Sequence, residues 1–409
     1  MGVLFDGIRK LPAEHVGMKK ELLLQWMAES QILKNANVRL NDAAIQVSDW
    51  FRKKGFRTCI LKGQGNALMY PNPYSRTPGD IDIWVEGGDK RVISFVRSIS
   101  PHEKACYHHI EFPSYKGVEV EVHYRPSFLL CFSHNRKLQK YYERVKEEQF
   151  SHRVMLGKQG EIAIPMVEFN LIFQLTHIYA HLMNEGIGLR QLLDYYYVLC
   201  YFYKVYQNSS NPSVSLSKGS STFSPSPSSS GSGDVTAPSR CSEPLRSKDG
   251  GPSKVSPNCA GWDRRDAIGD MTSATASTST DTSATAARSS FAANSSAAID
   301  RVQKELKELG VWKFAGGIMY IMQVVFGMPA SQLIVPPNEK YGKFVLNEVL
   351  EAGNFGKHDE RNRFGKSKLG HNLQRVYRDI RLMRYFPAEA LSEPIFRVWH
   401  FFWRLKHRR

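Results

Sequence analysis

Cysteine is scarce in this chain, with only six among 409 residues. The six are scattered without a Cys-x-x-Cys pair or a regular spacing, so the sequence indicates neither a disulfide framework nor a zinc site. Long apolar runs are missing as well. No stretch reaches the roughly 18 uninterrupted apolar residues that span a bilayer, and Asp6 interrupts the N-terminus before an apolar signal region forms. We therefore expect a protein of the reducing cytoplasm, without a transmembrane segment.

Acidic residues are fewer than basic ones. The chain has 55 Lys and Arg against 39 Asp and Glu, a formal net charge of +16. This excess suits an anionic partner, such as a nucleotide, a nucleic acid or an acidic surface. It is densest in residues 357–409, where 14 basic residues face 5 acidic ones and aromatic residues lie among them. Three interpretations of this basic C-terminus stay open: a solvated face over an aromatic core, contact with RNA or DNA, or docking to an acidic membrane surface.

Apolar residues are rare between residues 208 and 297. This segment holds 34 Ser and Thr among 90 residues. Such a composition cannot bury enough apolar surface to offset the chain entropy lost on folding, so it predicts a disordered linker. The segment carries 8 basic and 7 acidic residues, and the positive excess must therefore lie in the folded parts.

Regular structure is predicted on both sides of this linker. We expect an N-terminal helical segment at 1–48, an α/β core with a mixed sheet at 49–155, and an all-helical domain whose two parts, 156–207 and 298–409, are separated by the linker. The predicted helices are 21–29, 40–54, 62–70, 89–98, 165–206, 299–326 and 369–385, and the predicted strands are 57–61, 80–85, 108–112 and 118–124.

Two acids on one predicted strand are the most informative feature. Asp80 and Asp82 are two positions apart, so on a strand they point to the same face. Two carboxylates on one face repel each other, and a basic partner or a divalent metal must hold them. Carboxylate oxygens of this kind suit Mg²⁺ or Mn²⁺. A solvated turn or a chance alternation would give the same pair.

A second strand supplies a third acid. In residues 118–124 the alternation puts Glu119, Glu121 and His123 on one face. If this strand lies beside the first, Glu121 completes a cluster of three carboxylates. Such a cluster can bridge two metal ions about 3.5–4 Å apart, as in-line phosphoryl displacement requires. We interpret Glu119 as a solvated acid.

A glycine-containing turn precedes the acids. Lys62-Gly63-Gln64-Gly65 follows a predicted strand and opens a predicted helix. Glycine lets the backbone approach a phosphate, and amides at a helix N-terminus favour anions. Lys62 adds a point charge, and Arg76 adds a planar guanidinium. Together with the acids downstream, the turn suits phosphate binding.

The order of these elements resembles a known family. A Lys-Gly turn, a Tyr-Pro-x-Pro-x-x-Arg segment ending at Arg76, and Gly-Asp-Ile-Asp-Ile-x-Val over 79–85 resemble the uncharacterised nucleotidyltransferases of family 5, in the polymerase-β-like superfamily. Residues 121–124 resemble the family's acid-x-His-aromatic element, and 188–195 match a further segment. The resemblance covers roughly residues 40–199. Gln64 stands where the superfamily usually has Ser, the spacing from turn to acids is longer than usual, and the third acid is Glu where Asp is common.

This resemblance implies a nucleotidyltransferase core and an enzyme that uses Mg²⁺ or Mn²⁺. The reaction would transfer a nucleoside monophosphate from an NTP to the hydroxyl or phosphate of an unidentified acceptor, a small molecule, RNA or protein, with release of pyrophosphate. Asp80 and Asp82 would ligate the metals, and Glu121 would bind the catalytic metal and help to deprotonate the acceptor. The implied triphosphate contacts are Lys62, Gly63, Gln64, Arg76 and Gly79, and His123 would lie beside the metal ligands.

The predicted helix 165–206 holds further candidates. His177 and His181 are four residues apart and share a helix face. The zinc-protease motif is absent because no Glu follows His177. Either these are core histidines, or His181 faces the nucleotide cleft together with Arg190. Arg190 could instead pair with Asp194, four residues further on.

A non-catalytic alternative remains. The missing Gly-Ser pair and the basic C-terminus also suit a nucleic-acid-binding or regulatory protein built on a degenerate nucleotidyltransferase scaffold.

Overall fold

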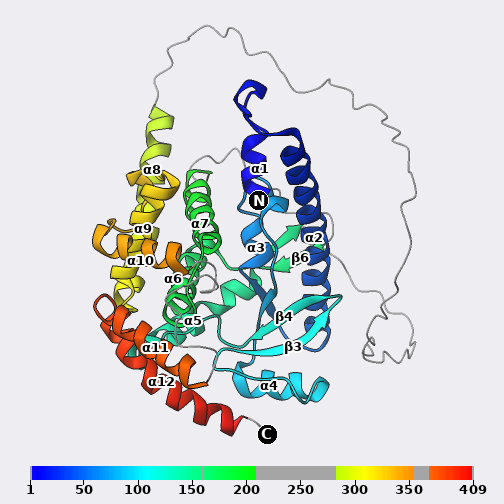
Figure 1. Ribbon diagram of the computed structural model, residues 1–409, viewed down its shortest axis with the longest axis vertical. Helices are drawn as coiled ribbons and strands as arrows, with labels where there is room; N and C mark the ends of the chain where they lie inside the picture. The colour runs from blue at the N-terminus through cyan, green and yellow to red at the C-terminus, as the bar shows by residue number, and fades with distance from the viewer. Residues whose placement is uncertain (1, 158–159, 209–281, 353–367, 408–409) are drawn as a thin grey trace, which may run out of the picture. The chain divides into compact units, whose positions relative to one another are not determined.

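The computed structural model describes residues 2–157, 160–208, 282–352 and 368–407 (Figure 1). Residues 1–212 and 286–409 form one compact unit. Most of the linker predicted at 208–297 lies outside the described residues. Its last part, from Thr282 onward, belongs to a helix, α8.

A mixed sheet of four strands forms the centre of the N-terminal part, as predicted. Its strands lie in the order β1 (Thr58–Leu61), β2 (Ile81–Val85), β4 (Val118–His123) and β3 (His109–Tyr115). β2 runs parallel to β4, and the two outer pairs are antiparallel. Every residue of β2 is buried. A central strand covered on both faces explains its continuous apolar character outside the acids.

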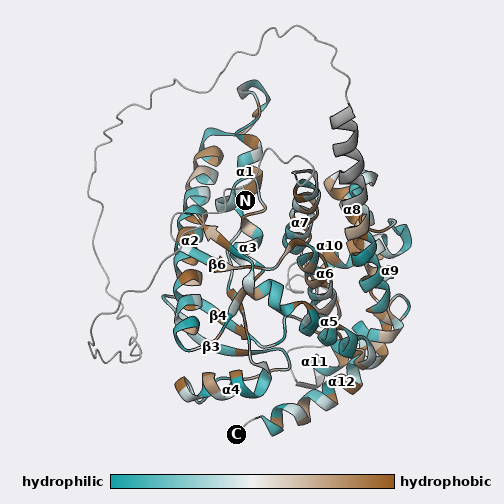
Figure 2. Ribbon diagram, turned by 180° about the vertical axis from the view of Figure 1, so that it is seen from behind, coloured by the Kyte–Doolittle hydropathy of each residue, from teal (hydrophilic) through white to brown (hydrophobic). Residues whose placement is uncertain are grey.

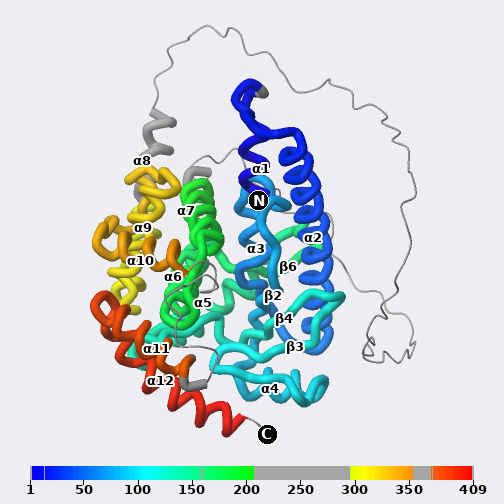
Figure 3. Tube along the Cα trace, in the orientation of Figure 1, coloured from blue at the N-terminus to red at the C-terminus, as the bar shows by residue number. Residues whose placement is uncertain are grey.

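Two helices cover one face of this sheet. Along β2 the side chains of Ile81, Ile83 and Val85 share a core with α2 (Lys20–Lys53) and α4 (Gly88–Ile99), and Figure 3 traces the chain through these elements. Two helices were predicted within α2, at 21–29 and 40–54. The structure has one, because no Gly or Pro interrupts the residues between them.

The other face of the sheet meets the helical part. Trp84, on the opposite side of β2 from Ile83, stacks against Phe169 of α6 (Val167–Asn184) with ring centroids 5.9 Å apart. α5 (Phe132–Ser151) lies on this side, whereas the hairpin of β5 (Arg153–Leu156) and β6 (Gly160–Ala163) contributes Leu156 and Ile162 to the core shared with α2. These three elements were not predicted, although Leu138, Tyr141, Tyr142 and Val145 of the mostly polar α5 recur at helical spacing.

The C-terminal part is helical, as predicted. Its remaining helices are α7 (Leu189–Asn208), α8 (Thr282–Glu308), α9 (Trp312–Phe326), α10 (Glu339–Ala352), α11 (Lys368–Met383) and α12 (Pro387–Lys406). Two predicted helices, 165–206 and 299–326, are each divided in two. The breaks contain Gly186 with φ 98° and Gly310 with φ 73°, backbone conformations that end a right-handed helix.

Short helices complete the N-terminal part. They are α1 (Gly2–Ile8), α3 (Gly63–Ala67) and two 3₁₀ turns, η1 (Ala13–His15) and η2 (Pro73–Ser75). A further 3₁₀ turn, η3 (Ala330–Gln332), lies in the helical part. α3 is shorter than the predicted helix 62–70, and it directly follows β1. The turn between β1 and α3 therefore lies at the end of the sheet where Asp80 enters β2.

Candidate active site

Three carboxylates meet at one end of the parallel strand pair. Asp82 of β2 is the register partner of Glu121 of β4, and Asp80 directly precedes β2. One oxygen from each of the three acids lies within 4.8 Å of the other two. The strand alternation predicted that the acids share a face, and the parallel pairing puts them side by side.

The acids lie in a cavity of about 610 Å³, a size suited to a small-molecule site. Strand ends, α6, α7 and the C-terminal helices surround it. The lining includes these residues singled out from the sequence: Lys62, Gly63, Arg76, Gly79, Asp80, Asp82, Glu121, His123, His181 and Arg190. Gln64 does not line it.

Two basic groups hold the most buried acid. Lys62 Nζ lies 3.1 Å from Asp82 Oδ2, and His123 Nε2 lies 3.0 Å from Asp82 Oδ1. Burial by itself raises the pKa of Asp82, but the charge of Lys62 and the bond from His123 outweigh it and hold that pKa below its usual range.

The surroundings of His123 favour a ring that is protonated at both nitrogens. Nε2 also lies 3.4 Å from Glu121 Oε2, while Nδ1 faces the carbonyl of Arg125 at 3.3 Å. Burial would lower the pKa of His123, but the bonds to Asp82 and Glu121 raise it to about 9. A positive ring therefore lies between two of the carboxylates.

Asp80 is the carboxylate whose charge is least compensated. The charge of Asp82 and then burial raise the pKa of Asp80. Glu121 behaves differently: burial raises its pKa, but the bond from His123 outweighs this and leaves the pKa lowered. The cluster retains a negative potential at Asp80, and its all-oxygen donor set fits a hard divalent cation.

The turn before α3 is fixed by its lysine. Lys62 has φ 51° and Gly63 has φ 42°, both in the left-handed region that favours glycine. Lys62 tolerates this conformation while its Nζ contacts Asp82 and, at 2.9 Å, His177 Nε2. A Cβ on Gly63 would lie 3.8 Å from the carbonyl oxygen of Asp80, so the turn packs directly beside the acids.

Gln64 points away from this site. Its side chain is buried against α2, where it donates to the Asn41 side chain and, at 3.5 Å, to the carbonyl of Asn37. Successive helical residues are rotated by about 100°, so the residue after Gly63 faces another element. The Gln64 side chain is therefore directed away from the cavity in which the predicted triphosphate contact would form.

The Arg76 side chain is paired with an acid inside the protein. Its Nε and Nη2 donate to the two carboxylate oxygens of Asp194 at 2.9 and 2.8 Å, and both side chains are buried. Tyr70 donates its hydroxyl to the same carboxylate at 2.5 Å. Of the two alternatives for Arg190, the pair with Asp194 is replaced by the pair of Asp194 with Arg76. The Arg76 side chain, predicted to contact the triphosphate, binds this carboxylate.

Arg190 lies over the backbone that leads into β2. A Cβ on Gly79 would lie 3.3 Å from Arg190 Nη2. Among the described residues, the buried Nε of Arg190 has no hydrogen-bond partner. Arg190 also belongs to the lining of the cavity, so its guanidinium borders the space in which a phosphate would lie.

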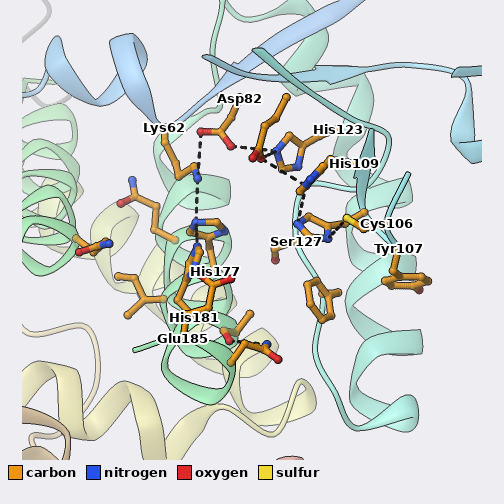
Figure 4. A pocket seen from close by; sticks show the side chains of 18 of the residues that line it. Lys62, Asp82, Cys106, Tyr107, His109, His123, Ser127, His177, His181 and Glu185 are labelled. Atoms are coloured by element: carbon orange, nitrogen blue, oxygen red, sulfur yellow. Dashed lines mark hydrogen bonds and ion pairs between the residues drawn. The ribbon is translucent and has the colours of Figure 1, made fainter. Parts of the chain in front are cut away.

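A row of side chains leads away from the acids (Figure 4). His177 Nε2 lies 2.9 Å from Lys62 Nζ and 2.9 Å from His181 Nε2, and His181 Nδ1 lies 3.2 Å from Glu185. Burial and the charge of Lys62 hold the pKa of His177 well below its usual value, so His177 is neutral. Both histidines line the cavity. They are therefore packed inside the protein and also face the predicted cleft.

The sequence reasoning missed a second row of side chains. His109 of β3 lies beside His123, its register partner, and its Nδ1 is 3.4 Å from Glu121 Oε2 and 3.1 Å from His108 Nε2. His108 Nδ1 in turn lies 3.4 Å from Cys106 Sγ. The consecutive histidines at the start of β3 were the available signal.

The basic C-terminus also reaches the cavity. Its lining includes Arg375 of α11 and, from α12, Phe396, Arg397, His400 and Arg404. Sequence spacing could not show this, because α12 is brought to the acids by packing against residues around Tyr107.

These features define a nucleotidyltransferase class of site, with carboxylates on neighbouring strands beside a Lys-Gly turn. The model of the family described as uncharacterised nucleotidyltransferase matches residues 1–206, more than half of the chain, and the protein belongs to this family. Family membership supports a transferase with a nucleotide substrate, and nucleotidyltransferases generally use divalent metals.

One solved structure is similar in part. It is the crystal structure of an antigenic nucleotidyltransferase-like protein from Paracoccidioides brasiliensis, with 14% identity over 41% of this chain and 76% of that chain, and a TM-score of 0.25. No curated protein matches the chain. Among the helices that the structure describes, none combines the length and apolar character needed to cross a membrane.

Proposed function

We propose that this protein transfers a nucleoside monophosphate from an NTP to the hydroxyl or phosphate of an acceptor, with release of pyrophosphate. The observation that supports it most is the parallel pairing of Asp82 with Glu121, which gathers three carboxylates in one cavity. Family membership points the same way.

Asp80, Asp82 and Glu121 would hold Mg²⁺ or Mn²⁺. Their donor atoms are all oxygens within 4.8 Å of one another, and the uncompensated charge at Asp80 favours a cation. When bound, such an ion neutralises phosphate charge and makes the acceptor hydroxyl more acidic.

The triphosphate would bind along the turn and Arg190. Lys62 supplies an ammonium at the edge of the acids, and Arg190 supplies a guanidinium whose Nη2 lies beside Gly79. At Gly63 and Gly79 the missing side chains leave the backbone open to a phosphate. We assign Arg76 a positioning role, since its ion pair with Asp194 fixes the segment before β2 to α7.

Glu121 would receive the proton of the acceptor. Its side chain is 35% exposed, against 4% for Asp82, so an acceptor can approach it from the cavity. His109 and His123 flank its Oε2 at 3.4 Å each and keep it oriented.

The test compares two glutamates on the same strand. We expect Glu121→Gln to lower the rate of pyrophosphate release with NTPs, Mn²⁺ and pools of metabolites or RNA by at least about 10²-fold. Glu119→Gln, on the exposed part of β4, should leave that rate unchanged. Equal rates for the two variants, or no pyrophosphate from the unaltered protein with any acceptor pool, would contradict the proposal.

One observation favours a second candidate. In the structure Lys62 and His123 already compensate Asp82, as a non-catalytic scaffold would require. If the protein is such a scaffold, NTP with Mn²⁺ will not raise its melting temperature, whereas an oligonucleotide will bind with a steep salt dependence.

A further inference from the structure

The outward side of α12 is apolar along its length. Exposed residues recur there at intervals of three or four, so they share one helix face. They are Leu391, Ile395, Val398, Phe402 and Leu405, with exposed fractions of 57, 64, 60, 62 and 42%. Single exposed apolar residues are common on proteins, but a continuous stripe of them marks an interaction site.

The neighbouring helix adds to this surface. α11 packs against α12, and five of its apolar residues are also exposed: Leu373, Val376, Tyr377, Ile380 and Met383. Figures 1 and 2 both place α12 at the outside of the unit, and Figure 2 shows hydrophobic and hydrophilic residues along it. We call the exposed apolar residues of the two helices the α11–α12 face.

The charged residues that are exposed on α11 and α12 themselves have one sign. The acids between residues 368 and 407 are Asp379, Glu389 and Glu393, and each is at most 4% exposed. The basic residues in the exposed class are Arg375, Arg384, Arg404 and Lys406. Because these acids are buried, and Glu393 is also bonded to Arg397, they do not offset the basic charges at the surface.

We infer that the α11–α12 face docks onto an anionic lipid surface. An apolar helix face with Trp and Phe, bordered by Lys and Arg and without exposed acids, has the composition of a helix that lies in the headgroup region. Trp399 and Phe401, 37% and 50% exposed, extend the stripe with side chains that favour the membrane interface. The attachment is peripheral, since no described helix spans a bilayer.

Two other occupants fit the face less well. Bases of a nucleic acid stack on aromatic rings, whereas the stripe consists mainly of Leu, Ile and Val. A second copy of the chain, docked by a twofold axis, would bring Arg384 and Lys406 against the same basic surface. An anionic bilayer satisfies both the apolar stripe and the positive border.

Docking here would set the cavity beside the lipid. Residues Phe396, Arg397 and His400 on another side of α12 line the cavity that holds the carboxylates. The inference itself does not depend on the proposed reaction, because it rests on the exposed side of the helix.

Flotation of the purified full-length protein with vesicles tests the inference. We expect it to bind vesicles of phosphatidylcholine with phosphatidylserine, and to bind phosphatidylcholine alone at least about tenfold more weakly, with the difference shrinking as KCl is raised. Ile395→Glu or Phe402→Glu should weaken binding by at least about tenfold. Arg384→Gln with Lys406→Gln should remove most of the preference for phosphatidylserine.

Ile32→Glu on α2 is the matched control, because Ile32 and Ile395 are both 64% exposed. It should leave flotation unchanged, and all variants should keep the far-ultraviolet circular dichroism and melting temperature of the unaltered protein. The inference fails if the protein does not float with phosphatidylserine vesicles, or if Ile32→Glu is as damaging as Ile395→Glu. It also fails if Ile395→Glu leaves flotation intact but converts a dimer, detected by light scattering, into a monomer. A third contrary outcome is an oligonucleotide, and no vesicle, whose binding depends on Arg384 and Lys406.

Discussion

Arg76 and Asp194 form a buried, two-pronged ion pair between residues 118 positions apart, with contacts of 2.9 and 2.8 Å. Arg76 lies just before β2, and Asp194 lies on α7. The pair therefore ties the entrance of the acidic strand to the helical part of the protein. Burial with complete hydrogen bonding is the arrangement in which losing one partner is most costly.

Breaking this pair from one side should destabilise the protein strongly. We expect Arg76→Met to lower the free energy of unfolding by about 3–5 kcal/mol, because it leaves the Asp194 charge buried without compensation. The double variant Arg76→Met/Asp194→Asn should lose less than Arg76→Met alone, since the amide keeps an acceptor for Tyr70 and carries no charge. Urea denaturation measures both. A double variant less stable than Arg76→Met would contradict this account of the pair.

Neutralising Asp80 should raise the stability of the metal-free protein and weaken its binding of metal. Its carboxylate is repelled by Asp82, so Asp80→Asn should raise the unfolding free energy measured without metal. The same change should remove the rise in melting temperature that we expect Mn²⁺ to produce in the unaltered protein. Thermal melts with Mn²⁺ and with a chelator measure both effects, and Glu119→Gln serves as the control. An undiminished Mn²⁺ effect in Asp80→Asn would count against the metal site.

Arg190 should contribute to binding of the nucleotide and little to stability. Its Nε has no partner among the described residues, so Arg190→Gln breaks no pair inside the protein that involves this atom. We expect an increase of about tenfold in KM for the NTP, or in Kd where turnover is absent, equivalent to about 1.4 kcal/mol. Arg153→Gln, at an exposed ion pair with Glu161, is the control. An unchanged KM in Arg190→Gln would remove it from the triphosphate site.

Asp379 should make stability fall as the pH rises. Burial and the neighbouring Glu393 raise the pKa of Asp379 to about 7, although Arg378 and Arg397 act in the opposite direction. The folded state thus holds a proton that the unfolded chain releases near pH 4. This contribution to stability is complete below about pH 4 and is lost as the pH rises through about 7.

Asp379→Asn removes this dependence. At pH 8 we expect the variant to be more stable than the unaltered protein by about 1–4 kcal/mol, with little difference at pH 4. Unfolding free energies measured in urea across this range test it, and Asp300→Asn on the exposed surface of α8 is the control. A stabilisation of the same size at both pH values would point to a cause other than the proton.

Much of the candidate site could be predicted from local sequence. Asp80 and Asp82 are two positions apart, as are Glu121 and His123, and on a strand that spacing alone decides which side chains share a face. The Lys62-Gly63 turn likewise follows from short-range order, because glycine permits the backbone conformation that joins β1 to α3. The mixed sheet and the helical C-terminal part also follow from the alternation and spacing of apolar residues.

Only the tertiary structure decided which groups these residues meet. Whether Arg76 faces a phosphate or Asp194, whether Gln64 faces the cavity or Asn41, and whether α12 covers the acids depend on contacts between distant parts of the chain. In each case several partners of similar chemistry could bind the side chain. The packing of the elements decides which of these partners lies within reach. Sequence spacing fixes the direction of a side chain relative to its own strand or helix, but the burial of apolar surface fixes how those elements approach one another.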